Sequence, residues 1–155
     1  MLSQRLEAIG IHLPPPPKPV AAYIPAVRVG STIYVSGQLP LSDGQLLFTG
    51  SVPTEVSVEH AQMAARQCLL NGIAAAGSVS GGIEKLGRLI QINGFVQSEK
   101  GFSMHPQVIN GASELALELM GDAGKHARIA VGVSSLPLNA PVEISFIFEM
   151  APEKK

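Results

Sequence analysis

The sequence contains one cysteine, no tryptophan, few charged residues and no long uninterrupted apolar run. Cys68 has no partner for an internal disulfide, and a lone thiol fits the reducing cytoplasm, where we expect the protein to reside. The first ten residues, MLSQRLEAIG, lack the apolar core and the cleavage site of a signal peptide. The longest apolar stretch, residues 68–79, is interrupted by polar and small residues and falls short of the roughly 20 residues of a membrane-spanning helix. We therefore expect neither export nor membrane insertion.

The net charge is close to neutral, at −1, and charged residues make up only 15% of the chain. A surface that binds nucleic acid needs a concentration of Lys and Arg, so this balance argues against a nucleic-acid partner. Hydrophobic residues make up 46% of the sequence, which is apolar for a small protein with no membrane span. Burial of apolar surface between copies of the chain explains this composition, and we expect a homo-oligomer.

Residues that bind metals show no ligand spacing. The four histidines are His12, His60, His105 and His126, and neither they nor the cysteine form a recognisable set. We expect no metal site and no cofactor, and interpret the histidines as surface or capping residues. His126 is of more interest, because it precedes Arg128 by two residues and so shares its side of a strand.

The amino-terminal segment differs from the rest of the chain. Ser3–Ile9 has the pattern of a short amphipathic helix. The sequence PPPPKP, Pro14–Pro19, predicts polyproline II, because proline fixes φ and excludes helix. We predict a first unit of residues 1–19, a helix and a rigid strap over the body, followed by one domain of residues 20–152. The alternative for the proline run is a ligand for an SH3-type domain.

The body predicts the order strand, strand, helix, strand, helix, strand, strand. Apolar residues at helical spacing predict helices over Val56–Ala76 and His105–Met120, with Gly77 and Gly121 as their stops. Alternation and turn residues predict strands at Tyr23–Val29, Thr32–Ser36, Leu86–Gln97, Arg128–Ser135 and Val142–Met150, with a shorter one at Gln45–Phe48. This order is typical of an α+β domain with both long helices on one face of the sheet. The other sheet face then needs cover from another subunit.

Arg128 is an unusual residue at the start of an apolar strand. Alternation separates its branched neighbours, which we expect to face the helices, from a second set on the opposite face: Arg128, Ala130, Gly132 and Ser134. Glu143 falls on the same partner-facing side of the final strand. The small residues predict a hollow beside the guanidinium, which suits a planar carboxylate held by two hydrogen bonds. An intersubunit salt bridge to Glu143 or Glu149 is the alternative.

The register of the last two strands bears on this choice. If they form a hairpin, Ser135 faces Val142 and Arg128 lies opposite Glu149. Arg128 and Glu143 are then roughly 20 Å apart within one chain, which is too far for one small ligand. Either a bulge shifts the register or the neighbouring subunit supplies Glu143, and we favour the neighbour.

Several motifs together resemble the RidA/YjgF (L-PSP) family of reactive enamine/imine deaminases. They span Val20–Met150 and comprise ARIAV at 127–131, Leu136-Pro137, Val142-Glu143-Ile144, SGQLP at 36–40, Tyr23 and Asn110. The resemblance implies a chorismate-mutase-like fold with a mixed sheet, assembled as a homotrimer with sites in the clefts between subunits. It also implies hydrolysis of 2-imino acids of the 2-aminoacrylate type to 2-keto acids and ammonia.

The resemblance assigns roles to individual residues. Arg128 would bind the substrate carboxylate, and Glu143 would orient or activate the attacking water. The residues expected to line the cleft are Tyr23, Ser36, Gly37, Asn110 and Ala130. Ala130 stands where the family has a cysteine, and Gly132 where an acidic residue is common. These two departures predict an emptier, less polar cleft and a divergent branch.

Three functions remain open from the sequence. The first is imine deamination, and the second is a non-catalytic, regulatory trimer that binds small carboxylates through the same arginine. The third is a ribonuclease, an activity attributed to some relatives. Neutral charge, few aromatic residues and the absence of an evident catalytic histidine pair argue against the third.

Overall fold

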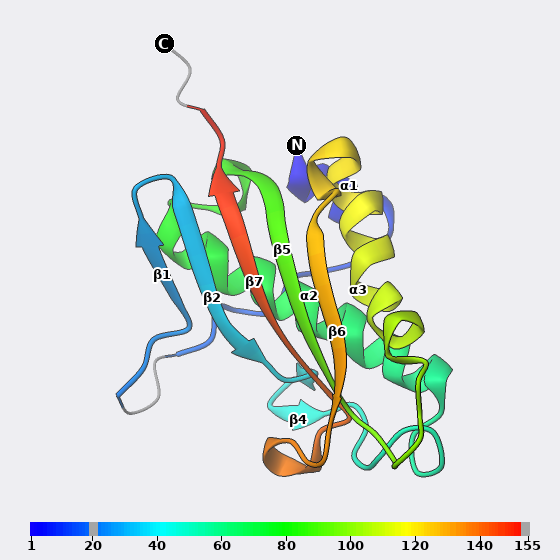
Figure 1. Ribbon diagram of the computed structural model, residues 1–155. Helices are drawn as coiled ribbons and strands as arrows, with labels where there is room; N and C mark the ends of the chain where they lie inside the picture. Colours follow the sequence, from blue (N-terminus) through cyan, green and yellow to red (C-terminus); the bar gives the residue numbers. More distant parts are fainter. Residues whose placement is uncertain (19–21, 153–155) are drawn as a thin grey trace.

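A computed structural model describes residues 1–18 and 22–152, and it is built around one five-stranded sheet (Figure 1). In spatial order the strands are β1 (Ala26–Val29), β2 (Thr32–Gln38), β7 (Val142–Met150), β5 (Leu86–Gln97) and β6 (Ala127–Val133). β5 and β6 are parallel and the other pairs are antiparallel, so the sheet is mixed. A separate small hairpin consists of β3 (Leu41–Ser42) and β4 (Gln45–Leu46).

Two long helices, α2 (Val58–Ser80) and α3 (His105–Met120), cover one face of this sheet (Figure 1). The short helix α1 (Leu2–Ala8) packs beside α3. Three 3-10 turns complete the chain: η1 (Ile83–Lys85), η2 (Gly121–Gly124) and η3 (Pro137–Asn139). The prediction of an α+β domain with both long helices on one sheet face is confirmed. Within the described part of the chain, no helix has the length and apolar character needed to cross a membrane.

The ends of the two long helices test the predicted stops. α3 has the predicted bounds and ends at Gly121, whose φ is 60°. α2 runs past the predicted stop at Gly77 and ends at Gly81, which has φ 83° and the left-handed conformation of a C-cap. Gly77 lies inside the helix, where its missing Cβ leaves room for Ile83, whose Cγ2 lies 2.7 Å from the Cβ position. The prediction that Gly77 ends the helix was therefore wrong.

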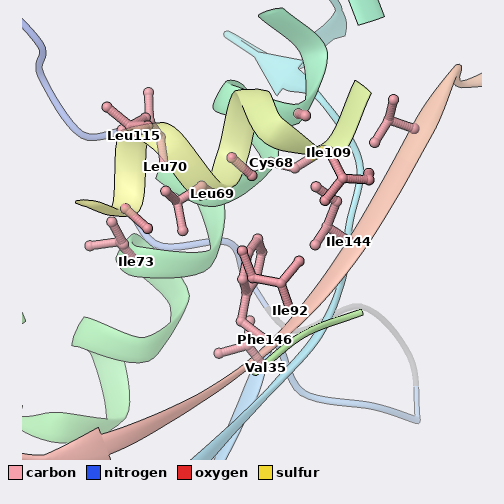
Figure 2. Close-up of a cluster of buried hydrophobic side chains, with 14 of the residues drawn as sticks. Val35, Cys68, Leu69, Leu70, Ile73, Ile92, Ile109, Leu115, Ile144 and Phe146 are labelled. Atoms are coloured by element: carbon pink, nitrogen blue, oxygen red, sulfur yellow. The ribbon is translucent and has the colours of Figure 1, made fainter. Parts of the chain in front are cut away.

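The core lies between the helices and the covered sheet face (Figure 2). Phe146 of β7 packs directly on Gly72 of α2, where a Cβ would lie 2.7 Å from Cε2 of the ring. Ile92 of β5 and Phe146 are paired across the strands, so their side chains share this face. Cys68 is fully buried in the same layer, and burial raises the pKa of its thiol well above the usual value. The core therefore accounts for Cys68 as a small apolar residue.

The pairing of the last two strands differs from the predicted hairpin. β6 pairs with β5 and not with β7, so β5 lies between them and β6 forms the edge of the sheet. A parallel pair needs a long crossover, and α3 supplies it between β5 and β6. The connection from β6 to β7 must then pass across β5, through η3. The predicted register of Arg128 opposite Glu149 was wrong for this reason.

The face assigned to β6 was also wrong. Arg128 is paired with Ile92, which is fully buried under the helices, so the arginine lies on the helix-covered side of the sheet. Ile129 and Val131, expected against the helices, lie on the open face and are 46% and 43% exposed. Alternation separates two faces of a strand, but it does not say which of them the helices cover.

The amino-terminal helix is held to the body by polar contacts. The carboxylate of Glu84 accepts hydrogen bonds from the backbone N–H groups of Leu2 and Ser3, at 2.8 and 2.9 Å. Burial of Glu84 opposes ionisation, but these hydrogen bonds outweigh it and lower the pKa of the carboxyl. In the predicted strap, Pro14, Pro15 and Pro17 line a hollow with the β3–β4 turn. Pro19 and the predicted domain boundary after it lie outside the described residues.

At Gly111 the backbone of α3 lies close to the backbone of α2, and this contact provides a test of the packing. A Cβ there would lie 2.8 Å from the backbone carbon of Gln62 and 2.9 Å from its Cα. Gly to Ala inside a helix normally stabilises by about 0.5–1 kcal/mol. In Gly111→Ala we expect overpacking to exceed this gain and to lower the free energy of unfolding by about 1–3 kcal/mol.

Urea unfolding measures this difference. Glu118→Ala, on the exposed side of α3, serves as the control and should change stability by less than about 0.5 kcal/mol. A Gly111→Ala variant as stable as the wild type would contradict the close helix contact.

Candidate functional site

Arg128 is anchored to α3 by two hydrogen bonds. Its Nη1 donates to Oδ1 of Asn110 at 2.8 Å and to Oγ of Ser113 at 3.1 Å. Asn110 and Ser113 are three residues apart, so both project from the same side of the helix. Arg128 itself is half-buried on the edge strand β6, and α3 is the element that crosses over it. The guanidinium is therefore fixed between the edge of the sheet and the helix.

This anchoring leaves one edge of the guanidinium available. The group has five N–H donors, and the two on Nη1 are both used. Nε and Nη2 have no hydrogen-bond partner among residues 1–18 and 22–152. Their N–H bonds point the same way and form the side-on fork that matches a planar carboxylate. The cluster is thus suited to holding one small carboxylate by two parallel hydrogen bonds.

Behind Ser113 lies a second contact, with His126. Ser113 Oγ is 2.9 Å from Nε2 of His126, and Nδ1 of the same ring is 2.6 Å from the carbonyl oxygen of Gly124. A carbonyl only accepts, so Nδ1 carries a proton, and Nε2 of the neutral ring accepts from the Ser113 hydroxyl. The sequence drew attention to His126, but it missed Ser113. The available signal was the three-residue spacing from Asn110 on one helix face.

Glu143 belongs to a different cluster, on the open face of the sheet. β2 carries a bulge there, because Val35 pairs with Phe146 and Gln38 with Ile144, so that two residues of β2 oppose one of β7. Those two residues are Ser36 and Gly37. A Cβ on Gly37 would lie 3.0 Å from Cδ of Glu143, so the carboxyl group occupies the space that any other side chain would fill.

The environment of this carboxyl group alters its acidity. Glu143 is half-buried, and burial disfavours the charged form, which raises the pKa of the carboxyl. No hydrogen bond or ion pair of this side chain is formed with another described residue. A carboxylate with a raised pKa is a stronger base than an ordinary glutamate, which suits it to taking a proton from water.

Ser36, also predicted for the site, is hydrogen-bonded to the segment that begins with Tyr23. Ser36 donates its hydroxyl proton to the carbonyl of Ile24 at 2.8 Å, and its backbone N–H bonds the carbonyl of Pro25 at 2.9 Å. Ser36 therefore holds the segment that precedes β1 against the bulge. Tyr23, at the start of that segment, is 59% exposed, so its ring is not packed into this chain.

One chain does not bring Arg128 and Glu143 together. Arg128 is level with Ile92 of β5 and Glu143 with Phe95, three residues further along. With two strand spacings between them, their Cα atoms are about 14 Å apart. They also lie on opposite faces, since Phe95 and Glu143 face away from the helices. The prediction of a shared face was wrong, and a small ligand that contacts both residues requires a second copy of the chain.

Comparison with known proteins identifies the family. A family model described as "YjgF/chorismate mutase-like, putative endoribonuclease" matches residues 3–150. This chain belongs to the YjgF/RidA family. The match begins within α1 and includes the chorismate-mutase-like mixed sheet and all three helices, so the predicted fold and family are confirmed. The assembly state of the chain stays a prediction.

Individual relatives cover nearly the whole chain. A solved structure of a protein of unknown function from Agrobacterium tumefaciens is 42% identical, with a TM-score of 0.89 over 97% of this chain and 92% of that one. Protein TCP17 of Trypanosoma cruzi is 36% identical over 96% of this chain and 94% of its own length. A 2-iminobutanoate/2-iminopropanoate deaminase of Dermatophagoides farinae is 30% identical over 88% of this chain and 92% of its own length.

The two departures from the YjgF/RidA motif behave differently in the structure. Ala130 packs partly against the core. Gly132 was expected to leave an empty place, and Ser98 and His105 lie beside it. A Cβ on Gly132 would lie 2.7 Å from Oγ of Ser98, which is 3.0 Å from Nε2 of His105. A polar pair therefore lies beside Gly132, and these three residues line a hollow at the surface.

Metal binding is a separate question. In the described parts of the chain, no three side chains of His, Cys, Asp or Glu lie together in a group that could hold a metal ion.

Gly37 offers a test of where the Glu143 carboxyl lies. Gly37→Ala should push the carboxyl toward solvent, because the end of a flexible side chain moves more easily than the backbone. Less burial disfavours the charged form less, so we expect the pKa of Glu143 to fall back toward that of an ordinary glutamate. Carboxyl-carbon NMR during a pH titration measures it, with Glu143→Gln to assign the signal. Stability should change by less than about 1 kcal/mol. An unchanged pKa would show that the carboxyl does not rest against Gly37.

Proposed function

We propose that this chain hydrolyses reactive 2-imino acids, including those formed from enamines such as 2-aminoacrylate, to 2-keto acids and ammonia. The observation that carries the proposal is the arrangement of Arg128, whose Nη1 is tied to α3 and whose Nε–Nη2 edge is left for a carboxylate. The relative from Dermatophagoides farinae, which carries the name of such a deaminase, supports the same assignment.

The proposed reaction needs little beyond positioning and one base. Arg128 fixes the substrate by its carboxylate, and the imine carbon next to it is already electrophilic. Water adds to the carbon of the protonated imine as one water proton passes to the Glu143 carboxylate, and the C–N double bond becomes the single bond of a neutral carbinolamine. The protonated Glu143 then returns this proton to the amine nitrogen. The C–N bond breaks as the hydroxyl proton passes back to Glu143, so that the keto group forms and ammonia leaves. The raised pKa of Glu143 suits it to these transfers.

We propose further that the site forms between subunits of a homotrimer. Two features support this: the two clusters lie on opposite faces of one chain, and the open sheet face exposes several apolar side chains. These are Val27, Val29, Tyr34, Ile129 and Val131. Apolar side chains grouped on one face mark a surface that pairs with another protein surface. A trimer has a mass of about 49 kDa, three times the 16.2 kDa of one chain.

A carboxylate-binding protein without catalysis is the second candidate. It is favoured by the observation that one chain carries the whole Arg128 cluster, whereas Glu143 lies on the other sheet face. Release of ammonia separates the two functions. Ribonuclease activity has less support, because three of the described histidines contact different groups. His60 stacks on Phe48, His105 packs edge-on against Phe102, and His126 is hydrogen-bonded to Ser113. They do not form the pair that such a mechanism uses.

A coupled assay tests the proposed function. An amino-acid oxidase generates 2-imino acids, and the protein should accelerate the appearance of keto acid and ammonia. Arg128→Lys keeps the charge but loses the two-point fork, so carboxylate affinity should weaken by about 1–3 kcal/mol while the assembly persists. The matched control is Arg28→Lys, at an exposed arginine of β1, which should bind as the wild type does.

Other results of this assay would point elsewhere. Tight carboxylate binding without acceleration would favour the non-catalytic function. Dissociation of Arg128→Lys subunits with ligand binding retained would favour the intersubunit salt bridge.

Subunit mixing tests whether the site is shared. Arg128→Ala and Glu143→Ala should each be inactive alone. After exchange of subunits at equal amounts, about one cleft in four combines the intact arginine of one chain with the intact glutamate of its neighbour. We therefore expect recovery of about a quarter of the wild-type rate. Exchange can be followed by native mass spectrometry, and exchange without recovery would contradict a cleft that takes the two residues from different chains.

A further inference from the structure

We propose that Ser113 and His126 are positioning residues for Arg128, and that they act as one unit to present its Nε–Nη2 edge to the ligand. The inference rests on the proposed function, since it takes Arg128 as the group that binds the substrate carboxylate. The chain of contacts runs from the carbonyl of Gly124 through the imidazole and the hydroxyl to the guanidinium.

A single hydrogen bond from Asn110 would leave the guanidinium plane free to turn. The two N–H bonds of Nη1 lie in that plane and diverge, so two acceptors in different directions fix its orientation as well as its place. Asn110 and Ser113 are these acceptors, at 2.8 and 3.1 Å. A long side chain held in its binding geometry loses less conformational freedom when the ligand arrives, and this preorganisation strengthens binding.

The Ser113 hydroxyl needs His126 to act as a reliable acceptor. A serine inside a helix readily donates its proton to a backbone carbonyl one turn earlier, which turns the oxygen away from its other partners. Nε2 of His126 provides a better-placed acceptor at 2.9 Å, so the hydroxyl proton points to the imidazole and an oxygen lone pair points to Arg128. The ring is fixed in turn by its bond to Gly124, in the turn η2 that precedes β6.

The competing explanation is that His126 only ties the start of β6 to that turn. Two substitutions separate the roles, because glutamine and asparagine place their amide groups differently. The longer Gln side chain brings its amide to the position of Nε2 and can still contact Ser113. The shorter Asn side chain reaches only the position of Nδ1, so it keeps the tie to Gly124 and loses Ser113.

The experiment compares His126→Gln and His126→Asn in the full-length protein, with 2-oxobutanoate as the carboxylate probe in calorimetry. We expect His126→Asn to weaken binding by roughly three- to tenfold, the usual effect of one neutral hydrogen bond, and His126→Gln to bind within about twofold of the wild type. In the deaminase assay the loss should appear in KM more than in kcat. The control His60→Gln changes a histidine that stacks on Phe48, far along the chain from this network, and should leave both unchanged.

A double-mutant cycle with Ser113→Ala examines whether the two residues act as one unit. Ser113→Ala should lose as much binding as His126→Asn, and the combined variant should lose no more than either alone. Additive losses, or a His126→Gln variant that binds worse than His126→Asn, would overturn the inference and assign His126 to the turn.

Crystal structures of the variants provide a readout that does not depend on the proposed function. In His126→Asn and Ser113→Ala the guanidinium should leave its present orientation, while in His126→Gln it should keep both bonds from Nη1. If the wild type neither binds 2-oxobutanoate nor releases ammonia, the proposed function fails, and these structures still decide the inference. An Arg128 orientation that is unchanged in all three variants would contradict it.

Discussion

The parallel pairing of β5 with β6 determines where the functional groups of this fold lie. Parallel neighbours need a crossover, and α3 provides it, so the helix returns across the edge strand that carries Arg128. Asn110 and Ser113 project from this crossover and reach the guanidinium. Because β5 is inserted between β6 and β7, Glu143 lies two strands away from Arg128 and faces the other side. The parallel pairing of β6 with β5 therefore divides the candidate site into two clusters.

Two glycines make room for polar side chains on this sheet. The bulge of β2 combines an extra residue with Gly37, and the absent Cβ is the space in which the Glu143 carboxyl sits half-buried. That burial raises its pKa, so local backbone geometry sets the basicity of the group. On β6, Gly132 leaves room for the Ser98–His105 pair. Since any Cβ at these two positions would collide with a polar side chain, glycine there serves the neighbouring groups.

Much of the fold could be predicted from the sequence, and the predictions that were wrong have physical causes. The helical spacing of apolar residues and a glycine stop predicted the bounds of α3, and strand alternation predicted those of β7. A buried helix face and a half-buried strand both impose strong sequence patterns. The face of β6 was predicted wrongly, since an edge strand with apolar residues on its open side mimics a strand with a buried branched face. The pairing of β6 with β5 also escaped prediction, because hairpins are the default for consecutive strands and only the crossover decides otherwise.

The candidate site was predictable in part for a different reason. Strand alternation singled out Arg128 and Glu143, and the resemblance to the family gave each a role. Each has an environment that suits the role proposed for it. Ser113 was missed because a serine on a helix carries no signal of its own. Its place in the cluster depends on Asn110, one turn away, and on Arg128, a strand residue that the sequence does not place beside it.

No described residue of the chain neutralises the charge of Arg128, and this favours a ligand over a salt bridge within the chain. Its contacts in the described residues are a side-chain amide and a hydroxyl, both neutral, and no carboxylate lies within salt-bridge distance. A half-buried cation that is hydrogen-bonded but not neutralised has lost part of its hydration and keeps its full charge. Neutral anchors therefore hold the guanidinium in place without competing for the carboxylate that we propose as its ligand. An acidic anchor in the position of Ser113 would fix the side chain equally well and would weaken every carboxylate ligand. Asn110, Ser113 and His126 are therefore residues of the kind expected around a guanidinium that is held in one orientation and keeps its positive charge free for an anion.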